Sequence, residues 1–286
     1  MDYKYNPSSN TFHLDSNTSS LLPSIVWHIT SRCLLDCKIC LDERLHEDSN
    51  NKINVQETVC ILKQLGVQKV DISGGEPLLS DALQEIVHEC VANGIYVTLT
   101  TSGFADNDNV EWLIENWRLF SRIIMSLDGF RELHNEHRGH DMAFSAFERL
   151  YERLTRQNCD ILRINSVITT LLMQESNMSR FLRVISELKP TEWCIIQPHP
   201  INKKSDTFDL LCISRQEFDE FIERCSSRMD AAGIQLIYRT NDYFSEGWIL
   251  DILGNIKKLS HTENYSISVN MLRTEITKIK RIIGGA

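Results

Sequence analysis

The sequence predicts an α/β protein, built as a partial (β/α)6 TIM-type barrel with a small α+β cap at its C-terminal end. Between about residues 25 and 200, short β-branched runs alternate with longer amphipathic segments, as in βαβ units with a parallel sheet. Six such runs are found, whereas a closed eight-stranded barrel takes about 250 residues. The 286 residues are 42% hydrophobic and 24% charged, an ordinary composition for a globular protein.

The elements follow one another in a regular order. The predicted strands are rich in Val, Ile and Thr and span residues 25–30, 69–72, 96–101, 122–126, 162–169 and 193–197. The predicted helices between them span residues 55–65, 81–93, 109–116, 143–157 and 176–188. The second helix is the best marked, because its apolar residues recur at helical spacing and Gly94 follows as a stop signal.

Three regions are expected along the chain. Residues 1–22 are polar and predict an arm or a small hairpin, and residues 23–200 form the partial barrel. Residues 201–286 are expected to form the C-terminal cap and substrate region, with a helix over 214–232, a strand over 234–239, a hairpin around Gly254 and a helix over 268–283.

Charge and hydropathy exclude several classes of protein. The chain has 30 Lys and Arg against 39 Asp and Glu, for a net charge of −9, so non-specific nucleic-acid binding is not expected. No stretch approaches the ~18 apolar residues of a membrane helix. The first residues lack the apolar core of a signal peptide. We therefore expect a cytoplasmic protein with reduced thiols and no membrane partner.

Three of the nine cysteines are clustered. Cys33, Cys37 and Cys40 form a C-x3-C-x2-C pattern directly after the first predicted strand, where a barrel carries its active site. Tetrahedral zinc takes four protein ligands, and no fourth Cys or His lies at a partner spacing. A four-iron cluster held by three thiolates keeps one iron open. Structural zinc and incidental cysteines remain the alternatives. His134, His137 and His140 are expected in a solvated loop rather than in a metal site.

At this point the sequence resembles the radical S-adenosylmethionine (SAM) enzymes. Their C-x3-C-x2-C pattern is followed in order by three further motifs, each at the end of a predicted strand: Gly74-Gly75-Glu76-Pro77, Thr100-Thr101-Ser102-Gly103, and Ser126-Leu127-Asp128-Gly129 with Arg138-Gly139 beyond it. The resemblance covers about residues 25–200. One departure is Ile39, where relatives usually carry an aromatic residue, and we expect it to alter the packing near adenine.

The resemblance implies one [4Fe–4S] cluster bound by Cys33, Cys37 and Cys40, with SAM completing the site. Gly74 and Gly75 would let the backbone approach the methionine part of SAM, while Pro77 stiffens the turn. Glu76 would accept from the SAM ammonium. Ser126 and Arg138 would bind the SAM carboxylate. The residues that would face ribose or adenine are Thr101, Ser102, Asn165 and Gln197.

The implied activity is reductive cleavage of SAM to a 5′-deoxyadenosyl radical, which abstracts hydrogen from a substrate. An external one-electron donor of flavodoxin or ferredoxin type would supply the electron. No catalytic side chain beyond the cofactor site is identified.

The expected substrate is a small molecule, such as a nucleotide or sugar derivative. The N-terminal region is too short for a peptide-recognition domain, and the C-terminal cysteines lack the closely spaced pairs of an auxiliary cluster. In this the chain resembles nucleotide-modifying members such as viperin-like enzymes. The alternatives are a peptide-modifying enzyme of the RiPP maturase type that borrows recognition in trans, and a non-catalytic metal-binding regulatory protein.

Overall fold

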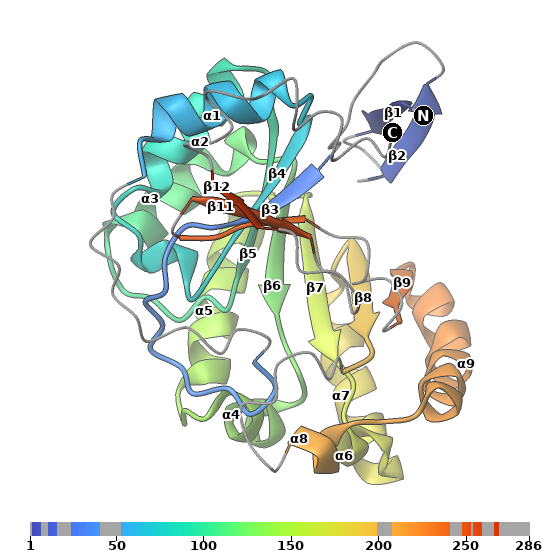
Figure 1. The fold of residues 1–286 in the computed structure, drawn as a ribbon. Helices are drawn as coiled ribbons and strands as arrows, with labels where there is room; N and C mark the ends of the chain where they lie inside the picture. The colour runs from blue at the N-terminus through green and yellow to red at the C-terminus, as the bar shows by residue number, and fades with distance from the viewer. Residues whose placement is uncertain are drawn as a thin grey trace.

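A ten-stranded sheet dominates the computed structural model, which describes residues 2–6, 11–15, 24–40, 53–198, 208–240, 248–252, 254–258 and 266–268. The strand order is β12-β11-β10-β3-β4-β5-β6-β7-β8-β9. Every neighbouring pair from β10 to β9 is parallel, and β11 and β12 extend the sheet antiparallel beyond β10. The sheet curves without closing (Figure 1), which confirms the open barrel.

Apart from β12, which was not predicted, the strands of this sheet lie close to the predicted runs. They are β3 (Ser24–His28), β4 (Lys69–Ser73), β5 (Tyr96–Thr101), β6 (Arg122–Ser126), β7 (Leu162–Val167), β8 (Glu192–Ile196), β9 (Gln235–Arg239), β10 (Trp248–Leu250), β11 (Asn255–Lys258) and β12 (Ser266–Ser268). Before them, β1 (Asp2–Asn6) and β2 (Thr11–Asp15) pair antiparallel as the expected small hairpin.

The helices connect the parallel strands. They are α1 (Val55–Gln64), α2 (Leu83–Ala92), α3 (Asp108–Asn116), α4 (Arg131–Arg138), α5 (Ala143–Arg156), α6 (Thr170–Met173), α7 (Glu175–Leu188), α8 (Phe208–Leu211) and α9 (Arg215–Ala232), with 3-10 turns at Pro77–Leu79 and Trp117–Leu119. Local signals set their ends. Asn54 caps α1, and Ser214 and Glu217 form a capping box at α9, which ends at Gly233.

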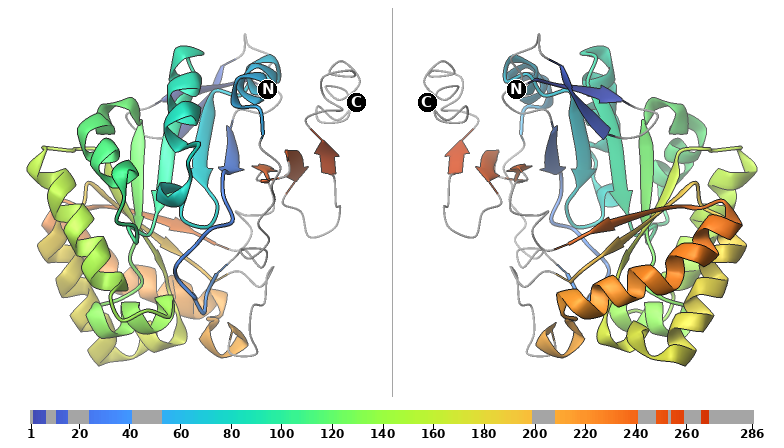
Figure 2. Two further views of the ribbon diagram at one scale, coloured as in Figure 1. Left: turned by 90° about the vertical axis from the view of Figure 1, so that its left-hand side faces the viewer. Right: turned by 90° about the vertical axis from the view of Figure 1, so that its right-hand side faces the viewer.

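The two faces of the sheet differ in chemistry. One face packs on the helices, as Trp193 of β8 does against Phe181 of α7 and Phe221 of α9 at ring distances of 5.6 and 6.3 Å. Successive side chains point to opposite faces of a strand, so Glu192 and its cross-strand partner Arg163 lie on the other, inner face. Figure 2 shows the helices gathered on the outer side of the curved sheet.

The region expected to form a cap also extends the main sheet. The predicted strand over 234–239 is β9, which pairs parallel with β8. The hairpin expected around Gly254 is present as β10 and β11, and β10 joins β3 in parallel. The helix expected over 268–283 lies outside the described residues. The sheet therefore continues beyond residue 200 on both edges.

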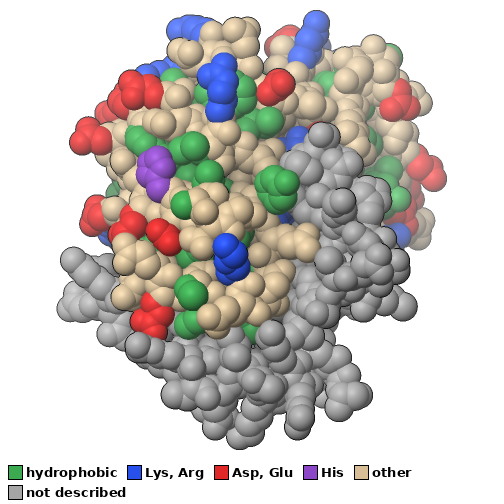
Figure 3. All heavy atoms as spheres, turned by 90° about the horizontal axis from the view of Figure 1, so that it is seen from above, with side chains coloured by type: hydrophobic (Ala, Val, Ile, Leu, Met, Phe, Trp, Pro, Cys, Tyr) green, Lys and Arg blue, Asp and Glu red, His purple; other side chains and the backbone are tan. Residues whose placement is uncertain are grey.

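The described surface is mixed in charge. Seen from above the view of Figure 1, acidic and basic side chains are interspersed on the face drawn (Figure 3). A search of the described helices finds none long and apolar enough to cross a membrane.

Candidate functional site

The three clustered cysteines lie on the segment that follows β3, which we call the cysteine loop (residues 29–40). Cys37 is buried, Cys33 and Cys40 are partly buried, and all three pack around Leu35 and Ala143. Burial raises the pKa of the Cys33 thiol to about 11. Within the described residues, no three Cys, His, Asp or Glu side chains gather as ligands of a single metal ion. A four-iron cluster places each thiolate on its own iron, and three thiols on one loop suit it.

The Gly74-Gly75 turn holds the first half of this loop. The backbone N–H groups of Gly75 and Glu76 donate to the carbonyls of Thr30 and Arg32, each at 2.8 Å. A Cβ on Gly74 would stand 2.4 Å from the Thr30 oxygen, and one on Gly75 2.2 Å from the Arg32 oxygen. From the sequence, these glycines were expected to let the backbone approach SAM closely. In the structure, the close approach that they permit is to the cysteine loop itself.

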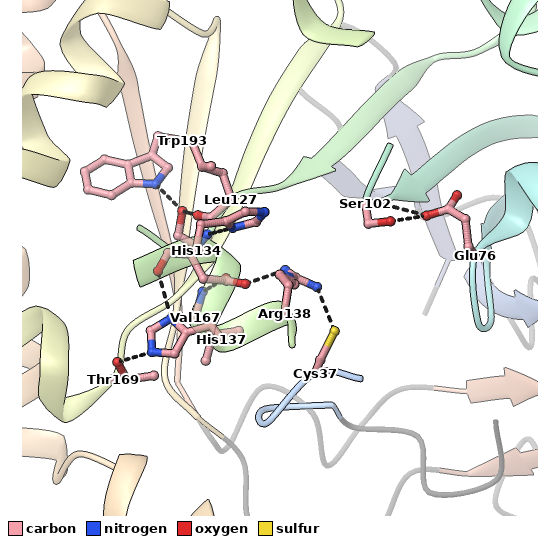
Figure 4. A network of polar contacts seen from close by, with 12 residues as sticks. Cys37, Glu76, Ser102, Leu127, His134, His137, Arg138, Val167, Thr169 and Trp193 are labelled. Carbon is pink, nitrogen blue, oxygen red and sulfur yellow. Dashed lines mark hydrogen bonds and ion pairs between the residues drawn. The ribbon is translucent and has the colours of Figure 1, made fainter. Parts of the chain in front are cut away.

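Glu76 lies at the centre of a buried polar group. It caps the 3-10 turn that begins at Pro77 by accepting from the Leu78 N–H, and it is 1% exposed. Its Oε1 accepts from the Thr101 hydroxyl at 2.5 Å, and its Oε2 accepts from the Ser102 N–H at 2.8 Å and hydroxyl at 2.5 Å. Thr101 and Ser102, expected to face ribose or adenine, therefore orient the carboxylate. Figure 4 shows the contact of Ser102 with Glu76.

The C-terminal end of α4 holds the second half of the cysteine loop. The Asp36 and Lys38 N–H groups, on either side of Cys37, donate to the carbonyls of Arg138 and His137 at 3.2 and 2.9 Å. The Arg138 guanidinium lies 2.5 Å from Asp128 Oδ2 and donates to Cys37 Sγ at 3.8 Å. Burial by itself lowers the pKa of Arg138, but attraction to Asp128 and Cys37 outweighs it and raises that pKa.

The prediction of a solvated histidine loop is wrong for His134 and His137. Both lie on α4, and they are 1% and 0% exposed. His134 Nδ1 accepts from the Asp128 N–H, and His137 Nδ1 donates to the Asp128 carbonyl, each at 3.0 Å. The spacing of three residues puts both rings on one helix face. Gly139 ends this helix in the left-handed conformation, and a glycine at that position was the sequence signal that could have indicated a helix.

The remaining predicted site residues fall in two places. Ser126 ends β6, and its cross-strand partner Asn165 lies within β7. The buried Asn165 Oδ1 has no hydrogen-bond partner in the described part of the chain. Gln197 is buried after β8, and its amide donates to the Ile213 carbonyl at 3.3 Å. Asn165 is thus available to a ligand, whereas the observed contact of Gln197 is to the segment before α9.

These residues fit the cofactors that the motifs imply. Three thiols share one loop that two backbone clamps hold, and a buried carboxylate is oriented to accept from a cation. Among the described residues, the Asn165 amide oxygen has no hydrogen-bond partner. Asp128, His134 and His137 complete the site and were not identified from the sequence. All of these groups lie at the carboxyl ends of parallel strands, where such folds bind their ligands.

Comparisons with known proteins show the family of the chain. The family described as the Radical SAM superfamily matches residues 27–188, more than half of the chain. The chain is 25% identical over 273 residues to an S-adenosylmethionine-dependent nucleotide dehydratase of Flammeovirga pacifica, which covers 91% of this chain and 90% of that protein.

Solved structures share the fold. Streptococcus suis SuiB bound to S-adenosylmethionine has a TM-score of 0.71 at 16% identity, over 93% of this chain and 68% of that one. SuiB bound to its precursor peptide SuiA has a TM-score of 0.65 at 18% identity, over 83% and 59%. The chain belongs to the radical SAM superfamily, whose enzymes use a [4Fe–4S] cluster and SAM.

Proposed function

We propose that this enzyme binds its cluster through Cys33, Cys37 and Cys40, binds SAM beside Glu76 and Asn165, and abstracts hydrogen from a nucleotide. When bound, the cluster and SAM supply the reductive SAM cleavage and the hydrogen abstraction. An external donor of flavodoxin or ferredoxin type delivers the electron. The similarity to the nucleotide dehydratase of Flammeovirga pacifica carries the proposal, because it extends over nearly the whole of both chains.

The side chains of this enzyme hold and orient its cofactors. The two backbone clamps fix the cysteine loop from opposite sides, at Thr30–Arg32 and at Asp36–Lys38. Thr101 and Ser102 aim the Glu76 carboxylate, which suits the ammonium group of SAM. Burial of Glu76 excludes water and strengthens that attraction.

Charged side chains also gather on the inner face of the sheet. Lys69, Arg122, Arg163 and Arg239 gather there, against the carboxylates of Asp71 and Glu192. Burial lowers the pKa of Lys69 to about 8, and the three arginines act in the same direction while Asp71 opposes them. Lys69, Arg122 and Arg163 lie at the amino ends of β4, β6 and β7, at the opposite end of the parallel sheet from the cofactor residues, so this charge does not select the substrate.

The test compares nucleoside triphosphates with their parent nucleosides. Anaerobically reconstituted protein receives SAM, dithionite and one candidate at a time, with deuterium at the ribose carbons. The proposal predicts 5′-deoxyadenosine formation above the level without substrate, deuterium transfer into it, and a nucleotide product lighter by the mass of water. The triphosphates should outperform the nucleosides, because the similar protein of Flammeovirga pacifica is named a nucleotide dehydratase.

Two matched cysteine variants connect turnover to the site. Cys37→Ala should lose iron and 5′-deoxyadenosine formation, whereas Cys60→Ala, at an exposed position on α1, should keep both. If no nucleotide stimulates 5′-deoxyadenosine formation in a protein with about four irons, the nucleotide proposal fails. Turnover of a peptide under those conditions would favour the peptide-modifying alternative, for which SuiB bound to its precursor peptide offers a likeness of fold.

A further inference from the structure

Arg138 occupies a position between a buried carboxylate and the sulfur of a cysteine. One guanidinium nitrogen lies 2.5 Å from Asp128 Oδ2, and another donates to Cys37 Sγ at 3.8 Å. The side chain of Arg138 is 14% exposed and that of Asp128 is 0% exposed. Figure 4 shows Arg138 directed toward the sulfur of Cys37. A full positive charge is therefore held next to Cys37, away from bulk water.

Asp128 is itself fixed from several sides. Its Oδ1 accepts from the Val167 N–H at 2.8 Å, its N–H donates to His134 and its carbonyl accepts from His137. His137 Nε2 faces the Thr169 hydroxyl at 3.2 Å. Burial lowers the pKa of both histidines, that of His134 to about 3. Both rings are therefore neutral, and the charges of this network reside on Asp128 and Arg138.

The guanidinium is not needed to seat the cysteine loop. The loop is already held on this side by the Arg138 and His137 carbonyls, which accept from Asp36 and Lys38. Gly139 adds a close backbone contact with Asp36. What the Arg138 side chain contributes beyond these backbone contacts is a directed positive charge and a hydrogen bond to one sulfur.

We propose that Arg138, held by Asp128, raises the reduction potential of the cluster that Cys37 binds. Hydrogen bonds to the sulfurs and the local charge are among the factors that set iron–sulfur potentials. A cation beside a thiolate ligand stabilises the reduced cluster, which carries one more negative charge. The electron comes from the external donor, and no bond forms or breaks. The inference depends on the proposed ligand role of Cys37, and goes beyond the SAM-carboxylate role that the motif implies for Arg138.

The test is a redox titration of the reconstituted cluster followed by electron paramagnetic resonance, without SAM or substrate. Arg138→Gln should retain its iron, and its midpoint should be more negative than that of the wild type. At the wild-type midpoint we expect the ratio of reduced to oxidised cluster to fall about tenfold, equivalent to 59 mV for one electron. Because SAM is absent, a contact of Arg138 with the SAM carboxylate cannot produce this shift.

A double variant shows whether a shift of the midpoint potential comes from the contact of Arg138 with Cys37, from a change in net charge or from misfolding. Arg138→Gln alone leaves Asp128 as a buried, unpaired carboxylate, which can prevent folding. Asp128→Asn with Arg138→Gln removes both charges, so the net local charge is unchanged. The midpoint should still be more negative than in the wild type, because the removed cation lay nearer to Cys37. A wild-type midpoint in the double variant would overturn the inference.

Lys38→Gln is the matched control. Lys38 follows Cys37 directly, but its exposed ammonium pairs with Glu136 at 2.9 Å rather than with the sulfur. Solvent screens this charge, so the midpoint should stay close to that of the wild type. Equal shifts in Lys38→Gln and Arg138→Gln would overturn the inference, and so would loss of iron from a folded Arg138→Gln protein. Failure of the wild type to build a cluster would instead refute the proposed site, and failure of every nucleotide would leave this titration unaffected.

Discussion

Gly139 and Asp36 approach so closely that a Cβ on Gly139 would stand 2.3 Å from the Asp36 carbonyl oxygen. Gly139 ends α4 in the left-handed conformation, with φ of 66°. Asp36 directly precedes Cys37 in the cysteine loop. The end of α4 can therefore lie this close to the segment that carries Cys37, a proposed cluster ligand, only because residue 139 lacks a side chain.

A pair of glycine variants tests this contact. Gly139 and Gly233 both end helices in the left-handed conformation, but a Cβ on Gly233 would meet nothing within 4 Å. Each change to Ala should cost about 1 kcal/mol of folding free energy through backbone strain. Gly139→Ala should in addition displace the loop and lower the iron bound after reconstitution severalfold, as measured by iron assay. Equal iron in the two variants would show that the contact does not matter.

The buried acceptor at Glu76 predicts a specific loss of SAM affinity. Glu76→Gln keeps the shape of the side chain but removes the charge that suits an ammonium group. Since charged hydrogen bonds are worth about 1.5–3 kcal/mol, SAM should bind roughly ten- to a hundredfold more weakly. Equilibrium dialysis of SAM against reconstituted protein measures this, with iron content expected to remain unchanged. Glu115→Gln, at an exposed site on α3, is the control and should bind SAM normally.

The strands and the site motifs could be predicted because their signals are local. The runs 96–101 and 122–126 match β5 and β6 at both ends, since β-branched residues bounded by turn residues mark a strand. The cysteine spacing and the Gly-Gly-Glu-Pro turn likewise occupy consecutive positions. These local signals do not predict the hydrogen-bond partner of each side chain in the fold, such as the contact of Ser102 with Glu76.

The errors came from contacts that the local sequence pattern does not specify. The helix α4 is strongly polar, so its sequence suggested a solvated loop, yet burial against Asp128 turns its two histidines inward. Likewise, β10 pairs with β3 across more than two hundred residues of sequence. Local patterning contains no information on a pairing of that range, which is why residues 201–286 were expected to form only a cap.

The buried histidines predict an acid-labile fold. Burial lowers the pKa of His134 to about 3 and also lowers that of His137, whereas an unfolded histidine titrates near 6.5. Between about pH 6.5 and pH 3, the unfolded chain binds protons that the folded chain does not. The free energy of unfolding should therefore fall as the pH drops below about 6.5. For each histidine the decrease should reach at most about 1.4 kcal/mol per pH unit. Above about pH 6.5 these two groups should not affect the free energy of unfolding.

Urea unfolding of the apoprotein at pH 7.5, 6.0 and 5.0 measures this dependence. His134→Asn should lower the stability at pH 7.5, because the Asp128 N–H loses a well-placed acceptor. The same variant should show a smaller decline between pH 6.0 and 5.0. An identical decline in the variant and the wild type would mean that His134 does not cause the acid lability.

The inner face of the sheet supplies the last prediction. Glu192 is 2% exposed and pairs with Arg122 at 3.1 Å and with Arg163 at 2.7 Å, across the first residues of three adjacent strands. Glu192→Gln leaves two buried guanidinium groups without their shared carboxylate. Removing one partner from a buried ion pair costs about 3–5 kcal/mol, so the urea midpoint should fall steeply. Glu152→Gln breaks an exposed pair with Arg156 on α5, and it should cost less than about 0.5 kcal/mol. If both variants unfold at the same urea concentration, the charges on the inner face do not hold these strands together.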